Sequence, residues 1–205
     1  MSKSVNELIE ANRSGTPWAI LILDDEITQE QVAEIDNPVL WYVASIGIHF
    51  SDSFILANKD KLKLHEVITR HTLKPETVEQ LWYGDLKPKL IVHQRLPKSL
   101  ISAAVEHSPS LTLRHQKLGV DELLVNKDRL NFDLVVEYQT LTQRALEVLA
   151  DELNWGLVYK LQELSPEQKQ QFRPRLLASF LGKGDGLKSK LFYWYNLLTK
   201  GHLLR

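Results

Sequence analysis

The residues best suited to metal chemistry lie between His65 and His71. Together with Glu66 they have the residue types of a zinc-protease helix, in which two histidines bind the metal and the glutamate acts as a base. That motif places its histidines on one face of the helix, about four residues apart. Here they are six residues apart and would lie on different faces. The chain also contains no cysteine, which excludes thiolate metal sites. We therefore expect neither a metal nor another cofactor.

Two further segments could bind phosphate or a cation. The glycines of segment 182–186, followed by Lys188 and Ser189, partly match a phosphate-binding loop, but the Gly-Lys-Ser/Thr ending and a preceding strand are missing. A flexible joint is the better interpretation. The acidic run 24–26 precedes an expected helix start, where solvated carboxylates are favoured. No serine, lysine or carboxylate pair has the sequence neighbours that a nucleophile or an acid–base pair needs. We therefore expect a protein without enzymatic activity, and an enzyme of another sort stays open as a third hypothesis.

A column of polar residues recurs every 23 positions and could form a binding ridge. Its members are Arg70, His93, Gln116, Gln139 and Gln162. The column beside it contains His71, Gln94, Lys117, Thr140 and Glu163. One interpretation is structural, with these side chains capping helix C-termini and bonding to each other between repeats. The other is a polar ridge that recognises a partner. The sequence leaves both open.

The C-terminal segment 173–205 is strongly basic. It carries seven basic residues and one acidic residue, a charge of +6, whereas the whole chain has a charge of −1 and its remainder therefore −7. Within it, four consecutive aromatic residues begin at Phe192 and are flanked by lysines. We predict a closing helix with two of the rings in the core. The alternative is a docking surface, since exposed aromatic and basic residues favour contacts with proteins or nucleic acids. Its residues would be Lys188, Lys190, Tyr193 and Trp194.

The helices that must position these residues follow an internal repeat. Apolar anchor residues recur at steps of 23 residues, with a single step of 22 after Leu96. The anchors are Ile27, Phe50, Leu73, Leu96, Leu118, Leu141 and Leu164. Five positions after them come Val32, Ile55, Val78, Ile101, Leu123, Leu146 and Lys169. All of these except Lys169 are apolar. Residues that lie five and eight positions after an anchor share one face of a helix. Each repeat is therefore predicted to bury this face.

The residue after each anchor predicts where the first helix of the repeat begins. Cap-forming residues occupy this position in four repeats, namely Thr28, Ser51, Thr142 and Ser165. Their hydroxyl groups can accept a hydrogen bond from an unpaired helix amide. Gln31 and Gln168 follow at the spacing of a capping box. Each repeat should therefore open with a helix of about two turns.

A second apolar column indicates a second helix in each repeat. Its members are Ala44, Val67, Leu90, Leu113, Val136 and Tyr159. Breakers such as Pro38, Gly84 and Pro109 separate this helix from the first. One such helix pair cannot bury its apolar face alone, so neighbouring repeats must stack. The predicted fold is an all-α solenoid of about six to seven two-helix repeats.

This prediction treats the chain as a single domain, residues 1–205. An N-terminal cap would occupy residues 1–26, with a helix over 3–13 and a packing segment over 17–23. The repeats would span residues 27–181, and the basic aromatic C-terminal helix would close the stack over residues 182–205.

The period, the cap after each anchor and the paired short helices resemble those of the leucine-rich repeat variant proteins, within the wider group of HEAT-like α-solenoids. The resemblance covers residues 27–180, in units such as LKPETVEQLWYGDLKPKLIVHQR. It implies a right-handed superhelix that offers a long surface to a macromolecule, and it carries over no enzymatic activity. Some members of the variant group bind an iron–sulfur cluster through cysteines, a feature that this chain cannot share.

The function predicted is that of a non-enzymatic binding or scaffold protein that recognises another protein. The alternative is a nucleic-acid-binding HEAT-like solenoid of the DNA glycosylase kind. The net charge of −1 argues against this alternative, because phosphate neutralisation dominates duplex binding, whereas the basic C-terminal segment favours it. A continuous basic face would indicate nucleic acid, and a mixed polar and aromatic face would indicate protein.

Composition and hydropathy indicate where the protein works. The chain is 43% hydrophobic and 25% charged, as is typical of a folded soluble protein. No stretch approaches the roughly 18 apolar residues of a membrane span, and the start MSKSVNELIEANRSG lacks the apolar region of a signal peptide. We expect a cytoplasmic protein that does not bind membranes.

Overall fold

The computed structural model describes residues 3–24 and 27–182, and this part of the chain is all-helical, with no strand. The helices are α1 (Val5–Arg13), α2 (Trp18–Leu23), α3 (Gln29–Ile35), α4 (Pro38–Gly47), α5 (Asp52–Ala57), α6 (Leu64–Arg70), α7 (Pro75–Gln80), α8 (Leu86–His93), α9 (Lys98–His107), α10 (Pro109–His115), α11 (Val120–Val125), α12 (Phe132–Tyr138), α13 (Gln143–Val148), α14 (Trp155–Leu161), α15 (Pro166–Gln171) and α16 (Arg173–Gly182). A 3-10 turn, η1 (Lys127–Arg129), precedes α12. The all-α prediction is confirmed for these residues.

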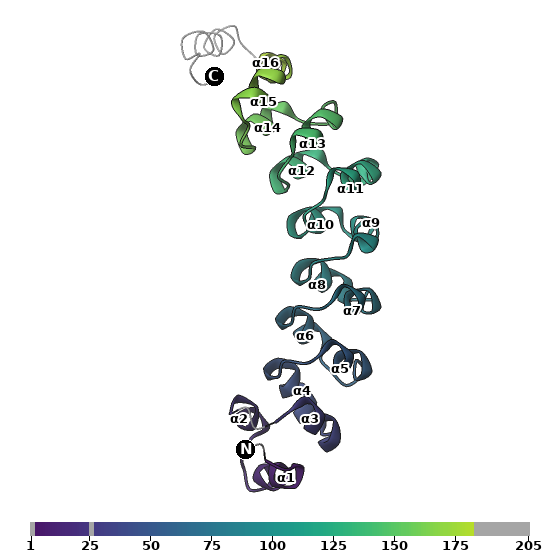
Figure 1. Cartoon of the computed structure of the whole chain (residues 1–205), viewed down its shortest axis with the longest axis vertical. Coiled ribbons are helices and arrows are strands. Elements are labelled where there is room, and N and C mark those ends of the chain that lie inside the picture. Colours follow the sequence, from purple (N-terminus) through teal and green to yellow (C-terminus); the bar gives the residue numbers. More distant parts are fainter. Residues whose placement is uncertain (1–2, 25–26, 183–205) are drawn as a thin grey trace. The chain divides into compact units, whose positions relative to one another are not determined.

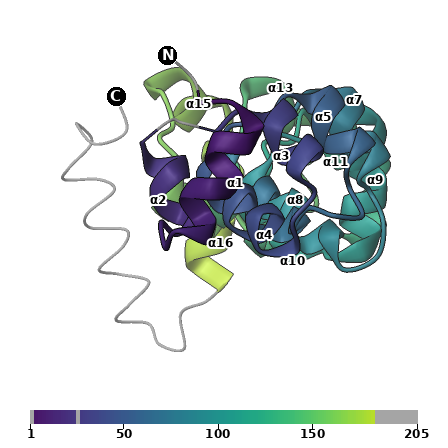
Figure 2. The same ribbon diagram turned by 90° about the horizontal axis from the view of Figure 1, so that it is seen from below.

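The chain divides into two compact units, residues 1–104 (unit 1) and 105–205 (unit 2), with the boundary inside α9. In unit 1, α2 packs on α4, α4 on α6 and α6 on α8. Figures 1 and 2 show α3, α5 and α7 along the other side of these helices. In unit 2, α10, α12, α14 and α16 pack on one another in the same way. Within each unit, consecutive repeats therefore meet through their second helices.

The predicted caps begin the first helices of the repeats. The hydroxyl oxygens of Thr28, Ser51, Thr142 and Ser165 each accept a hydrogen bond from the backbone N–H three residues later. Thr28 with Gln31, and Ser165 with Gln168, form complete capping boxes. Lys74 and Gly119 occupy the same position without a side-chain cap. The short first helices are thus started locally, by residues that the sequence identifies.

The first-helix face that the anchors predict is buried. The six apolar residues five positions after the anchors all belong to the core, while Lys169 is half-buried. The anchors themselves are buried except for Leu118, which is half-buried. This column is therefore confirmed as the core side of the first helices.

The second apolar column is confirmed from Ala44 to Val136, which are all fully buried, and is wrong at Tyr159. Tyr159 is 39% exposed, and the preceding Val158 takes the core position on α14. The reason is that two adjacent positions of the second helices are buried, as with Val135 and Val136 on α12. At the step of 22 residues, a column with a strict period of 23 shifts by one position on the second helices. Its members on α10 and α12 are still buried after this shift, and the column leaves the core only at α14.

The N-terminal cap forms as two helices. A capping box between Ser4 and Glu7 starts α1, close to the predicted start at residue 3. α1 packs on α3, and the apolar segment 17–23 forms α2, which buries Trp18 and Leu21 against α4. The predicted closing helix lies outside the described residues. The single-domain organisation, the solenoid arrangement and its right-handedness stay predictions.

Candidate binding surface

A buried glutamine joins consecutive repeats of unit 1 at the end of a second helix. The side-chain oxygen of Gln94 accepts a hydrogen bond from the backbone N–H of Leu73 at 2.9 Å. Its amide group donates to the backbone carbonyls of Ile68 and His71, at 2.5 and 2.7 Å. These carbonyls lie at the C-terminal end of α6, where a helix leaves carbonyl groups without intrahelical partners. Gln94 therefore connects the end of α6 to the first residue of the next repeat.

Gln139 and Gln162 make the same connections in unit 2. Each accepts a hydrogen bond at 2.9 Å from the backbone N–H of the residue 21 positions earlier. Each donates to the carbonyls 26 and 23 positions earlier, at distances of 2.5–2.8 Å. A carboxamide suits this place because it supplies both an acceptor and two donors. We call Gln94, Gln139 and Gln162 the ladder glutamines.

The ladder glutamines correct the register of the predicted polar column. The equivalent of Gln139 in unit 1 is Gln94, and not the neighbouring His93, which is exposed. The step of 22 residues between Leu96 and Leu118 shifts the second helices together with the anchors. A column that keeps a strict period of 23 therefore changes register at this step. The single step of 22 residues between the anchors Leu96 and Leu118 was the sequence signal that could have identified the buried column.

The predicted site residues consequently fall into different surroundings. Gln116 and Gln139 are only 6% exposed, and Gln162 is half-buried. The hydrogen bonds of Gln139 and Gln162 to the ends of the preceding second helices match the structural interpretation of the column. Arg70 and His93 lie exposed on α6 and α8, and their partner-binding role stays a prediction. The other predicted site residues, which are Lys188, Lys190, Tyr193 and Trp194, lie outside the described residues.

His71 occupies the ladder position of the preceding repeat without the hydrogen bonds of a glutamine. It is 5% exposed, and its ring stacks on His49, with ring centroids 4.7 Å apart, and on Phe50. Its buried Nδ1 atom has no hydrogen-bond partner in the structure. Burial lowers the pKa of His71, and the neighbouring His49 lowers it further. The surroundings of this histidine thus favour its neutral form.

The histidines that suggested metal chemistry are separated. The His65 ring nitrogen Nε2 lies 3.0 Å from a carboxylate oxygen of Asp85, whereas His71 is buried beside His49. No group of three or more histidine, aspartate or glutamate side chains within residues 3–24 and 27–182 is placed to hold a metal ion. Residues 25 and 26 of the acidic run, and the glycine stretch beyond Gly182, are outside the described residues.

Unit 1 contains a groove of about 370 Å³ lined by α4, by the start of α6 and by the turn before α8. Tyr42 and Tyr83 line it and are 51% and 42% exposed. Three buried leucines also line it, namely Leu62, Leu64 and Leu86. We call this site the tyrosine groove. It combines exposed aromatic rings with an apolar interior, a composition typical of protein-binding sites.

The charged residues at the tyrosine groove differ in their partners. The carboxylates of Glu66 and Asp85 lie against cationic or titratable groups, 3.9 Å from Arg70 and 3.0 Å from His65. Lys63 also lines the groove, and the ammonium group of Lys59 lies 6.0 Å from the centre of the Tyr83 ring. Among the described residues no carboxylate pairs with either lysine. The groove lining therefore carries charges of both signs, one lysine (Lys63) and two carboxylates (Glu66 and Asp85).

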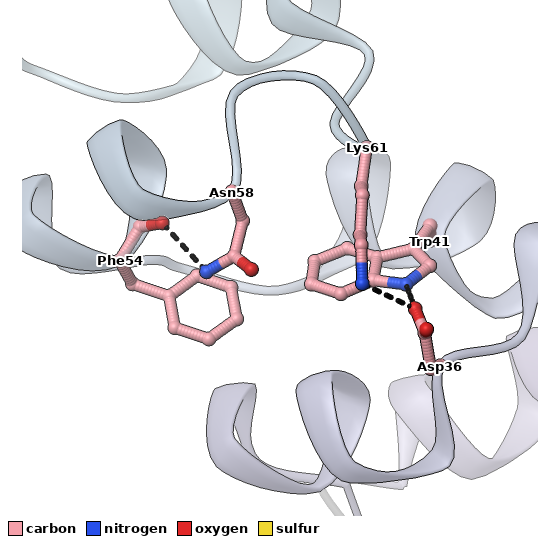
Figure 3. A network of polar contacts seen from close by, with 5 residues as sticks. All are labelled: Asp36, Trp41, Phe54, Asn58 and Lys61. Carbon is pink, nitrogen blue, oxygen red and sulfur yellow. Dashed lines mark hydrogen bonds and ion pairs between the residues drawn. The ribbon is translucent and has the colours of Figure 1, made fainter.

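A polar network fixes the neighbouring part of unit 1 (Figure 3). One carboxylate oxygen of Asp36 accepts hydrogen bonds from the indole N–H of Trp41 at 2.9 Å and from the Lys61 ammonium at 2.7 Å. The hydrogen bond from Lys61, and then that from Trp41, lower the pKa of Asp36. Lys61 also lies 5.4 Å from the centre of the Trp41 ring. The network ties the end of α3 and the start of α4 to the loop before α6, which supplies Lys63 to the groove.

Unit 2 presents a second set of exposed apolar side chains on its second helices. Tyr138 and Leu161 immediately precede the ladder residues Gln139 and Gln162, so they hold equivalent places on α12 and α14. Both are exposed, as is Tyr159. The guanidinium group of Arg114 lies 5.1 Å from the centre of the Tyr138 ring. These side chains form a mixed aromatic, apolar and cationic surface.

Comparison with protein-family models, with curated proteins and with solved structures finds no match. No helix in the described part of the chain is long and apolar enough to cross a membrane. We therefore infer the function from the geometry of the two surfaces.

Proposed function

We propose that this chain is a non-enzymatic binding protein that recognises another protein through the second-helix surfaces of its repeats. The observation that carries the proposal is the set of tyrosines exposed on or next to the second helices, namely Tyr42 on α4, Tyr83 in the turn before α8, Tyr138 on α12 and Tyr159 on α14. Tyrosine combines a large apolar contact area with a hydroxyl group that can form hydrogen bonds, and it is enriched among the residues that dominate interface energies.

We further propose that the repeats form a right-handed α-solenoid similar to the leucine-rich repeat variant proteins. Its support is the recurrence of the same cap, the same buried column and the same glutamine connection in successive repeats. In such an array equivalent side chains of neighbouring repeats come to lie beside one another. Exposed residues at one repeat position would then act together as a binding surface.

The proposal favours a protein partner over nucleic acid because of the kind of surface found in each unit. Basic residues such as Lys63 and Arg114 alternate with tyrosines, carboxylates and apolar side chains. Nucleic-acid surfaces rely on a continuous cationic patch that neutralises phosphates. The mixed surface matches the anatomy of protein interfaces, with aromatic residues inside a polar rim.

Capture from lysate of the native host with paired variants tests this function. The full chain is immobilised and the captured proteins are quantified by mass spectrometry after nuclease treatment. Two double variants are compared with the wild type. One carries Tyr42→Ser and Tyr83→Ser, the other carries Tyr138→Ser and Tyr159→Ser, and Val125→Ser serves as the control. Val125 is a suitable control because it is 73% exposed but lies on a first helix, α11.

We expect at least one protein to be captured roughly tenfold less by one of the double tyrosine variants than by the wild type. The control variant should capture this protein as well as the wild type does. A tenfold loss corresponds to about 1.4 kcal/mol, which is a modest value for a central interface residue. Circular dichroism melting should show that the variants remain folded. Equal capture by all variants would contradict the proposed function.

A further inference from the structure

We propose that the contact between the first two repeats of unit 1 is an acid-labile joint, which opens locally when the buried side chain of His71 takes up a proton. The first of these repeats contains α3 and α4, the second contains α5 and α6, and α4 packs on α6. This inference goes beyond the proposed function, because it concerns how unit 1 comes apart and can be tested without a partner protein.

The joint lacks the hydrogen bonds that a ladder glutamine makes elsewhere. Gln94 bonds to three backbone groups between the second and third repeats, and Gln139 makes the same three bonds in unit 2. His71 holds the equivalent position between the first and second repeats, but its Nδ1 atom has no hydrogen-bond partner. The polar contacts that the structure gives across this joint lie elsewhere, namely Gln29 with Ser51, Asp36 with Lys61 and Ser45 with Lys63.

The ring of His71 is buried among aromatic side chains. It is 5% exposed and stacks on His49 and Phe50, with ring centroids 4.7 and 5.9 Å apart. Both partners belong to the link between α4 and α5. A protonated imidazole carries an N–H group on each nitrogen, so Nδ1 would become a charged donor without a partner. Because a buried charge without a partner is costly, protonation favours a form in which the ring reaches water.

Three charged or titratable groups act on His71, and they do not compensate for an added proton. His49, in the link after α4, and Arg70, on α6, repel the charge, while Asp52, on α5, attracts it. The Asp52 carboxylate already accepts a hydrogen bond from the backbone N–H of Lys74 at 2.9 Å. α4 carries no charged residue, and the side chain that α8 contributes to this site is an uncharged ladder glutamine.

Acid therefore shifts the joint towards its open form. Burial is the main cause of the lowered pKa of His71, whereas in the open joint its pKa returns to about 6.5. The closed form is fully favoured above that pH and loses stability as the pH falls towards the folded pKa. The Asp36–Lys61 ion pair across the same joint does not respond in this range, because the hydrogen bond from Lys61 lowers the pKa of Asp36 from its ordinary value of 3.8.

Opening of the joint would take the tyrosine groove apart. Tyr42 lies on α4, in the first repeat, whereas the other residues that line the groove lie between Leu62 and Leu86, in the second and third repeats. Separation of α4 from α6 would remove Tyr42 from these residues. Acid would thereby change the shape of this candidate binding surface.

The test is hydrogen exchange of the full chain, followed by mass spectrometry at pH 7.5, 6.5 and 5.5 and corrected for the intrinsic exchange rate at each pH. We expect the opening equilibrium constant of the amides in α4 to rise about tenfold between pH 7.5 and 5.5, the linkage limit for one histidine with an open-state pKa of about 6.5. The amides of α12, which ends at the ladder residue Gln139, should change by less than about twofold.

Two variants remove the titrating group in different ways. His71→Phe keeps an aromatic ring beside Phe50, and His71→Gln offers the carboxamide of the other joints. Each should reduce the rise in α4 to less than about twofold, and a failure of either variant to fold leaves the other as the test. His93→Gln is the matched control, because it changes an exposed histidine next to the ladder residue Gln94 and should keep the tenfold rise.

Two results would overturn the inference. An equal rise in α4 and α12 would show that acid destabilises the whole chain and not this joint. A rise in α4 that persists in the folded His71 variants would show that another group takes up the proton. Neither result depends on partner capture, so the proposed function is tested separately.

Discussion

Two of the buried polar side chains, Gln94 and Gln139, have well-defined tasks at the ends of the second helices. Gln94 satisfies three backbone groups of two consecutive repeats. His71 holds the same place one repeat earlier, yet a neutral imidazole offers only one donor and one acceptor. By the offsets of the ladder glutamines, a glutamine at position 71 would contact the backbone of Phe50, Ile48 and Ser45. The stacked pair of His49 and His71 replaces these contacts.

His71 should make the stability of the protein depend on pH. Burial is the main cause of its lowered pKa, with repulsion from His49 next, while Asp52 acts in the opposite direction and Arg70 adds to the repulsion. The unfolded chain, with a histidine pKa of about 6.5, then binds the proton at a higher pH than the folded chain. The stabilisation is therefore complete above that pH and is lost as the pH falls through the folded pKa.

The measurement is the free energy of unfolding in urea at pH 7.5, 6.5 and 5.5. His71→Gln should fall less in stability on acidification than the wild type and should gain about 1 kcal/mol at pH 7.5 from the completed hydrogen bonds. His93→Gln, a change at an exposed histidine of α8, is the control and should keep the wild-type dependence. An unchanged pH dependence in His71→Gln would show that another group is responsible.

Leu90 tests the core at the level of a single side chain. It is fully buried on α8, which packs on α6. Leu90→Ala should reduce the free energy of unfolding by about 2–5 kcal/mol, because it removes apolar contacts and leaves a cavity. The control is Lys89→Ala at the neighbouring exposed position, with an expected effect within about 0.5 kcal/mol. A loss below about 0.5 kcal/mol for Leu90→Ala in urea titration would mean that the register is wrong.

The individual helices are too short to be stable alone. Six of the seven first helices have six or seven residues, and isolated helices need roughly 12–15 residues to form in water. Their start is fixed by local caps, but their stability must come from contacts between repeats. The ladder glutamines supply directional contacts of this kind, since each joins the end of one second helix to the start of the following repeat.

Removal of a ladder glutamine should therefore loosen two repeats at once. Gln139→Ala leaves the backbone N–H of Leu118 and the carbonyls of Leu113 and Gln116 without this partner. The expected cost is about 1–3 kcal/mol for each buried group that stays unpaired. At roughly 2–4 °C per kcal/mol, the melting temperature should fall by several degrees.

Thr140→Ala, at the exposed position next to Gln139, is the matched control. Melting curves by circular dichroism measure the difference, and pull-down at low temperature shows whether capture changes. If Gln139→Ala melts like the wild type but no longer captures its partner, Gln139 belongs to the polar ridge that recognises a partner.

At the scale of the whole molecule, the charge balance limits the range of partners. The net charge of −1 combines a −7 portion and a +6 C-terminal segment. Duplex DNA repels the larger, acidic portion and is attracted only by the smaller segment, which weakens the electrostatic contribution to binding.

We accordingly expect the full chain to bind duplex DNA no better than non-specifically, with a Kd of about 10⁻⁴–10⁻⁶ M at physiological salt. Fluorescence anisotropy with a labelled random-sequence duplex, repeated over a series of salt concentrations, measures this. The basic peptide of residues 173–205 serves as the comparison and should bind more tightly at low salt. Nanomolar affinity of the full chain with a steep salt dependence would favour the glycosylase-like alternative.

Local patterns in the sequence were sufficient to predict the helices, their starts and most of the core. Thr28 and Ser165 cap the helices that follow them because a hydroxyl group needs only an amide three residues away. Val32 and Leu90 are buried because helical periodicity alone assigns them to an apolar face. These properties depend on neighbours within one or two turns, which the sequence lists in order.

The candidate binding surface and the contacts of the glutamines were decided only by the tertiary structure. Gln94 and Gln139 are buried because their partners lie 21–26 residues away on a packed neighbour. The tyrosine groove likewise brings together Tyr42, His65 and Tyr83 from three successive repeats. A polar or aromatic residue at a helix position does not indicate whether its side chain will meet a neighbouring repeat or water. That depends on how the repeats pack, and one residue of slip between Leu96 and Leu118 is enough to exchange an exposed column for a buried one.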